Sequence, residues 1–121
     1  MPIYRRDVTG AFRALAALGL NPKAQASALG YQAPPKTSLT RIRALIRARY
    51  PDDEEVQRRV RTIVDLKEAL DLVFEDDAKI RTWLGVTHRQ FKNQSARELI
   101  VSGDIENLGL VLDQIKRLKQ V

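Results

Sequence analysis

Side chains suited to covalent or metal chemistry are scarce in this 121-residue chain. It has no cysteine, and its single histidine, His88, lies in a polar stretch beside Arg89. A Ser/His/Asp or Cys/His arrangement needs a histidine held against a nucleophile, and a histidine metal cluster needs more than one histidine. We therefore expect His88 to be an exposed loop residue, and we predict no catalytic residue, no metal site and no cofactor.

The acidic residues Glu75, Asp76 and Asp77 could in principle bind a hard cation. An oxygen cage needs several converging ligands, however, and three residues at the start of a helix do not provide that geometry. We favour helix capping as their role. The chain also lacks the GxxxxGK[ST] and GxGxxG loops that cradle phosphates. The sequence thus predicts a protein that is not an enzyme.

Basic residues are more informative because they are segregated. Residues 1–50 hold 9 Lys and Arg against 1 Asp and Glu, and residues 51–121 hold 12 against 14. The net charge of +6 is therefore +8 followed by −2. Such segregation favours a polyanionic partner for the first half, and the alternative is a merely solvated basic surface.

Residues 20–49 have the order of a helix-turn-helix. Asn21-Pro22 predicts a short helix ending at Gly30, Pro34-Pro35 breaks the chain, and residues 36–50 resume as a basic helix. The second helix of this motif enters the major groove, where Arg suits guanine and phosphate, and Ser and Thr suit phosphate or mixed contacts. Two packed helices with a solvated basic face remain the alternative. The predicted DNA-binding residues are Lys36, Thr37, Ser38, Thr40, Arg41, Arg43 and Arg47.

Residues typical of helix caps and helix ends indicate the remaining elements of the first half and the centre of the chain. Asp7 or Thr9 should cap a first helix that ends at Gly19. After Pro51, Asp52 with Glu55 reads as a capping box for a long helix. That helix keeps an apolar period of 3.6 as far as Phe74 and should be buried along this stripe, with Lys67 among the residues of its polar faces.

The last third of the chain contains the clearest helix signals. Residues 78–84 should form a helix closed by Gly85, followed by a polar linker from which Val86 and Phe91 turn inward. Ser95 and Glu98 form a capping box for a short helix that ends at Gly103. Asp104 then caps an amphipathic final helix. No stretch alternates like a strand, so we predict an all-α protein, with a helix-turn-helix module (residues 1–50) packed on a helical domain (residues 51–121).

No apolar run is long enough for a signal peptide or a membrane span. Together with the absence of cysteine, this predicts a cytoplasmic protein without membrane contact.

Several groups of residues resemble one known family in their order and spacing. They are Ala69 to Phe74 with Asp76, Trp83-Leu84, Ala96 to Ile100 with Ser102 to Asp104, Val111-Leu112 with Ile115 and, upstream, Ser38 to Arg41. In these groups the chain resembles the Xre/MbcA/ParS family of antitoxins, over about residues 10 to 118.

The resemblance implies a type II antitoxin that neutralises a RES-domain toxin, an NAD-consuming enzyme, and represses its own operon by binding DNA. It implies a heteromeric complex containing an antitoxin homodimer, in which the loop 86–94 and the last helix cover the toxin's NAD pocket. A stand-alone helix-turn-helix regulator with a helical dimerisation domain is one alternative, and an adaptor that binds no nucleic acid is another. The toxin-binding residues expected on this basis are Trp83, Leu84, Arg89, Phe91, Lys92, Arg97, Lys116, Arg117 and Lys119.

Overall fold

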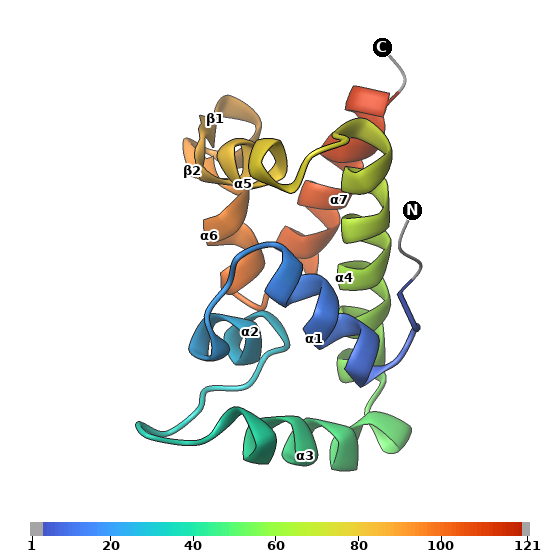
Figure 1. Ribbon diagram of the computed structural model, residues 1–121, viewed down its shortest axis with the longest axis vertical. Helices are drawn as coiled ribbons and strands as arrows, with labels where there is room; N and C mark the ends of the chain where they lie inside the picture. Colours follow the sequence, from blue (N-terminus) through green and yellow to red (C-terminus); the bar gives the residue numbers. More distant parts are fainter. Residues whose placement is uncertain (1–3, 120–121) are drawn as a thin grey trace.

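The computed structural model describes the backbone of residues 4–119 and the side chains of residues 4–118, and helices dominate it (Figure 1). The all-α prediction is confirmed, with one two-residue antiparallel ladder as the exception. In chain order the elements are α1 (Val8–Ala17), α2 (Pro22–Ala28), α3 (Leu39–Arg49), η1 (Tyr50–Asp52), α4 (Glu54–Val73), α5 (Asp77–Gly85), β1 (Thr87–His88), η2 (Arg89–Phe91), β2 (Gln94–Ser95), α6 (Ala96–Val101) and α7 (Ile105–Lys119).

Most helices begin at the capping residue that the sequence indicates. The side chain of Asp7, not Thr9, accepts a hydrogen bond from the backbone of α1, and Asn21 does the same for α2. Ser95 and Glu98 make both hydrogen bonds of a capping box at α6. These side chains satisfy amide groups that the first helical turn leaves without partners.

Two predicted helix starts come too early, by one to three residues. The cap of α4 is Asp53 rather than Asp52, and its carboxylate accepts from Glu55 N and Val56 N, so the predicted capping box is absent. The preceding residues form η1 instead, because a proline at the start of a short 3-10 turn is well accommodated there. Similarly, α3 begins only at Leu39, with Ser38 as its cap.

The core forms around α4, which lies beside α7 and runs in the same direction (Figure 1). The helix α1 packs across α4 as well, so apolar residues from both predicted modules join one cluster of buried side chains. Val60, Ile63 and Leu66 of α4 are fully buried in it. The predicted boundary near residue 50 falls in η1. The division of the chain into two modules at this boundary stays a prediction.

The helix α2 packs on α1 and on α6. At the second contact, the Ser27 hydroxyl donates to the carbonyl of Val101 (2.5 Å), and Arg59 Nε donates to the carbonyl of Gly103 (2.7 Å). A connection of ten residues (29–38) then leads to α3. The usual turn of a helix-turn-helix has about three to four residues, so the connection here is longer than in the standard motif.

The prediction that Lys67 lies on a polar face of α4 is wrong. Its side chain is 1% exposed, forms an ion pair with Asp71, and has its Nζ 3.5 Å from Asp77. Burial lowers the pKa of Lys67, but the hydrogen bond and charge of Asp71, with Tyr4 and Asp77, raise it by more. The ammonium group is therefore kept charged in the interior by carboxylates from α4 and α5.

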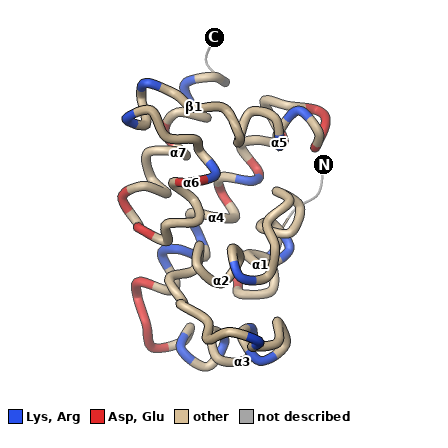
Figure 2. The backbone as a smooth tube through the Cα atoms, turned by 90° about the vertical axis from the view of Figure 1, so that its left-hand side faces the viewer, with Lys and Arg blue, Asp and Glu red and all other residues tan. Residues whose placement is uncertain are grey.

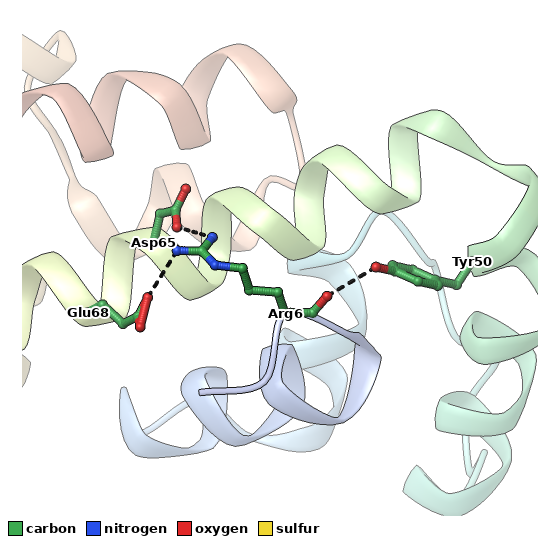
Figure 3. A network of polar contacts seen from close by, with 4 residues as sticks. All are labelled: Arg6, Tyr50, Asp65 and Glu68. Carbon is green, nitrogen blue, oxygen red and sulfur yellow. Dashed lines mark hydrogen bonds and ion pairs between the residues drawn. The ribbon is translucent and has the colours of Figure 1, made fainter. Parts of the chain in front are cut away.

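A polar network ties the residues before α1 to α4 and η1 (Figure 3). The Arg6 guanidinium donates to Asp65 and to Glu68 of α4, and the Tyr50 hydroxyl donates to the Arg6 carbonyl (3.1 Å). The hydrogen bond and the charge of Asp65 raise the pKa of Arg6. This network fixes where the chain enters α1 relative to where it leaves α3.

Within the described residues, no helix is both long and apolar enough to cross a membrane.

Candidate nucleic-acid and partner interfaces

The helix α3 forms one end of the molecule, and the β1–β2 hairpin lies near the other (Figure 1). Residues 8–51 contain seven Lys and Arg and no Asp or Glu. Only Ile42 and Ile46 of α3 are fully buried, so one narrow face holds the helix to the core and the rest faces outward. Figure 2 shows basic positions along this helix. The geometry makes α3 an exposed, positively charged ridge.

Three of the predicted DNA-binding residues are available on this ridge. Lys36, Thr40 and Arg41 are exposed, and their side chains form no hydrogen bond or ion pair with any other described residue. Lys36 has a left-handed backbone conformation (φ 65°) just before the helix. These residues surround the amino-terminal end of α3, where the helix dipole adds positive potential.

The other predicted DNA-binding residues have partners within the protein. The Thr37 hydroxyl donates to the carbonyl of Pro34 (2.7 Å), and the Ser38 hydroxyl accepts from Arg41 N as the helix cap. Arg43 lies 5.2 Å from the centre of the Phe12 ring, and Arg47 donates to the Thr9 hydroxyl (3.0 Å). The two arginines therefore join α3 to α1, in addition to the predicted role.

Acidic residues define the orientation in which a polyanion could approach. Asp52, Asp53, Glu54 and Glu55 follow the carboxyl end of α3 directly. This stretch would repel phosphate, whereas the amino-terminal end of α3 would attract it. The predicted DNA-binding set omits Arg49, whose guanidinium carbon lies 5.8 Å from the ring centre of Tyr31 near this acidic end. Its position among the other arginines of α3 is the feature of the sequence that could have indicated it.

The opposite end of the molecule is built on an aromatic cluster beneath the hairpin. The Trp83 ring centre lies 6.1 Å from that of Phe74, 5.2 Å from that of His88 and 6.5 Å from that of Phe91. Phe91 is buried, and His88 is half-buried rather than exposed as predicted. The single histidine is therefore part of the packing that supports the loop 86–94.

The loop itself is a compact hairpin in which Thr87 pairs with Ser95 and His88 with Gln94. Lys92 and Asn93 both have left-handed backbone conformations (φ 55° and 65°), which are uncommon for residues other than glycine. The His88 carbonyl accepts from Asn93 N (3.0 Å) and helps to hold this turn. Val86, the extended residue between α5 and β1, is 48% exposed, so the prediction that it turns inward is wrong.

The predicted toxin-binding residues divide by burial. Leu84 and Phe91 are core residues, exposed by only 1% and 2%, so their side chains shape the surface from beneath instead of touching a docked partner. Trp83 is half-buried. The Lys119 side chain lies outside the described residues. The basic residues predicted at this end are exposed, namely Arg89, Lys92, Arg97, Lys116 and Arg117.

Replacing Phe91 with leucine tests the role of this cluster. We expect a loss of about 1 kcal/mol of unfolding free energy, because the change keeps an apolar side chain but leaves part of the ring volume empty. Trp83 fluorescence should change as well, since the two rings are in contact. Chemical denaturation followed by fluorescence measures both. Val86→Ala at an exposed position is the matched control, and an equal loss there would contradict the assignment.

Among residues 4–118, no group of three or more His, Asp or Glu side chains is arranged to hold a metal ion.

The chain was compared with known protein families, curated proteins and solved structures. No family model, no curated protein and no solved structure matches this chain.

Proposed function

We propose that this protein is the antitoxin of a type II toxin–antitoxin system, with α3 as its operator-binding element and the hairpin end as its surface for a RES-domain toxin. The observation that carries the proposal is the separation of two basic surfaces, one at each end of the molecule. The resemblance of three groups to Xre/MbcA/ParS antitoxins supports the toxin class, namely Trp83-Leu84, Ala96 to Ile100 with Ser102 to Asp104, and Val111-Leu112 with Ile115. Such an antitoxin acts by occlusion and needs no catalytic residue.

Co-expression with the adjacent gene tests the toxin-binding half of the proposal. The neighbour should arrest growth when expressed alone, and the present chain should restore growth. The double variant Arg89→Glu/Lys92→Glu should abolish this rescue, because it reverses the charge of the exposed hairpin without removing a buried group. Lys79→Glu/Arg58→Glu, at exposed positions outside the hairpin, is the control. A non-toxic neighbour would contradict the proposal.

Arg41→Ala tests the DNA-binding half. We expect operator affinity to fall by about tenfold, and the slope of log affinity against log salt to decrease by about 1, because one phosphate contact and its released counterions are lost. Fluorescence anisotropy with the chain's own promoter DNA at several salt concentrations measures both quantities. Lys79→Ala removes the same charge from α5 and should leave both unchanged. Unaltered binding by the Arg41 variant would exclude this residue.

A stand-alone regulator with a helical dimerisation domain would use α3 in the same way. Size-exclusion chromatography of the co-expressed pair separates the two functions. A stable complex with the neighbouring protein supports the antitoxin, and a homodimer that ignores that protein supports the regulator.

A further inference from the structure

The helix α3 carries an exposed leucine that the predicted DNA-binding set does not include. Leu45 is 37% exposed, whereas Leu39 on the same helix packs against the core. Arg41 precedes Leu45 by four residues and Arg49 follows it by four, so the three side chains lie along one line of the helix surface. A single exposed leucine is ordinary on a protein surface, and its surroundings decide whether it has a function.

Contacts with the core and with α1 account for one side of α3. The residues that make these contacts are Ile42, Arg43, Ile46 and Arg47. Because an α-helix turns by about 100° per residue, these four side chains cover about 140° of its circumference. The exposed residues at the centre of the remaining side are Arg41, Ala44, Leu45 and Ala48. The free side of α3 is therefore an apolar strip (Ala44, Leu45 and Ala48) with arginines beside it.

The charge around the apolar strip determines which partner fits it. The helix forms one end of the molecule (Figure 1), and residues 8–51 contain seven Lys and Arg and no Asp or Glu. A second copy of the chain, docked through the same strip, would place arginine against arginine at a cost in binding free energy. Duplex DNA has the complementary arrangement, because phosphates border the major groove and the C5-methyl groups of thymines lie on its floor. The strip thus matches a major groove that contains thymine.

We propose that Leu45 reads thymine in the operator by apolar contact with its C5-methyl group. The inference rests on the proposed function, since it requires that α3 binds DNA, and it adds the base that gives this binding a sequence preference. Contacts between arginine and phosphate position a protein on DNA but do not read the sequence directly. An apolar contact with a base supplies that information, and Leu45 is the largest apolar side chain on the free side of α3.

The probe is the chain's own promoter fragment, amplified once with thymidine triphosphate and once with deoxyuridine triphosphate. The two DNAs differ only in the C5-methyl groups, so their phosphates and base pairing are the same. We expect the full-length chain to bind the uracil DNA about fourfold more weakly for each methyl group that loses its contact, the factor that burial of one methyl group gives. Fluorescence anisotropy measures both affinities. The slope of log affinity against log salt should be equal for the two DNAs, because no phosphate contact changes.

Leu45→Ser tests whether this residue makes the contact. The position is exposed, so the variant should fold as the native chain does, and circular dichroism checks this. It should bind the thymine and uracil DNAs equally, with about the affinity of the native chain for the uracil DNA. Leu110→Ser, at an exposed leucine of α7 (48%), is the matched control and should keep the full preference for thymine.

The outcomes separate this inference from the proposed function. Equal binding of the two DNAs by the native chain, with the expected salt dependence, would overturn the thymine contact and leave DNA binding by α3 standing. A preference for thymine that persists in Leu45→Ser would also overturn it, because another residue would then read the methyl groups. If Leu45→Ser abolishes self-association and leaves DNA binding unchanged, the strip belongs to a second copy. No binding of the thymine DNA at any salt concentration would overturn both proposals.

Discussion

Gly103→Ala should destabilise the protein by about 3 kcal/mol or more, because the new methyl group meets both backbone strain and a close neighbour. Gly103 has φ 71°, a left-handed conformation that costs alanine more than glycine. A Cβ at this position would lie 2.2 Å from the carbonyl oxygen of Ser27. The end of α2 would have to move away from α6, with loss of the hydrogen bond from Ser27 to Val101.

Urea denaturation measures this loss, and two other glycines provide controls. A Cβ added at Gly85 or Gly109 would have no atom of another segment within 4 Å, and neither glycine has a positive φ. Gly109→Ala, within α7, should instead stabilise the protein by up to about 1 kcal/mol through helix propensity. If Gly103→Ala leaves the free energy of unfolding unchanged, the contact between α2 and α6 adjusts to the added methyl group at little cost.

The glycines illustrate which parts of the fold the sequence predicts. Gly19, Gly30 and Gly103 follow capped, periodic segments, and each has the left-handed conformation expected after a helix. Caps and apolar stripes are local signals, since they depend on residues three or four positions apart. The existence of each helix was therefore predictable, and the starts of α3 and α4 differ only because neighbouring polar residues compete for the cap.

Features that depend on contacts between distant segments were not predictable in the same way. The ion pair of Lys67 with Asp71 is a local contact between residues four apart in α4. Tyr4 and Asp77, from segments outside α4, also lie against the Lys67 ammonium, and its periodicity as a polar position does not reveal these contacts. Likewise, Lys92 and Asn93 both have left-handed backbone conformations, and no glycine in the sequence indicates them. Tertiary packing determines these conformations, and local propensity does not.

The candidate site shows the same division. The charge of residues 8–51 is visible in the sequence, and Thr40 and Arg41 of α3 are exposed, as is Lys36 just before it. Which arginines are free depends on α1, because Phe12 and Thr9 engage Arg43 and Arg47. Leu84 belongs to a group that carries the family resemblance and Phe91 is a predicted toxin-binding residue, yet both are buried in the core. Residue types in the sequence thus indicated the candidate surfaces, and packing in the folded protein determines which of their side chains are exposed.

Asp71→Ala should cost about 3 kcal/mol of unfolding free energy, because it leaves the buried Lys67 ammonium without its principal partner. Asp77, at 3.5 Å, is more exposed and compensates only in part. The double variant Lys67→Met/Asp71→Leu removes both charges and should recover most of the loss, since replacing a buried pair with apolar residues is often neutral. A double-mutant cycle that adds the single variants Lys67→Met and Asp71→Leu, measured by urea denaturation, gives the coupling between the two residues. A loss no larger in Asp71→Ala than in Lys67→Met/Asp71→Leu would contradict this account.

The pH dependence of stability follows from the same pair. The pKa of Lys67 in the folded protein is raised above its ordinary value of 10.5, so folding favours the protonated amine. This contribution is fully present below the unfolded pKa of 10.5 and is lost as the pH rises through the higher folded value. Between about pH 9 and pH 12, the native chain should therefore lose more unfolding free energy than the Lys67→Met/Asp71→Leu variant, which lacks the titrating group. Parallel losses in the two chains would show that the Lys67–Asp71 pair does not retain its proton on folding.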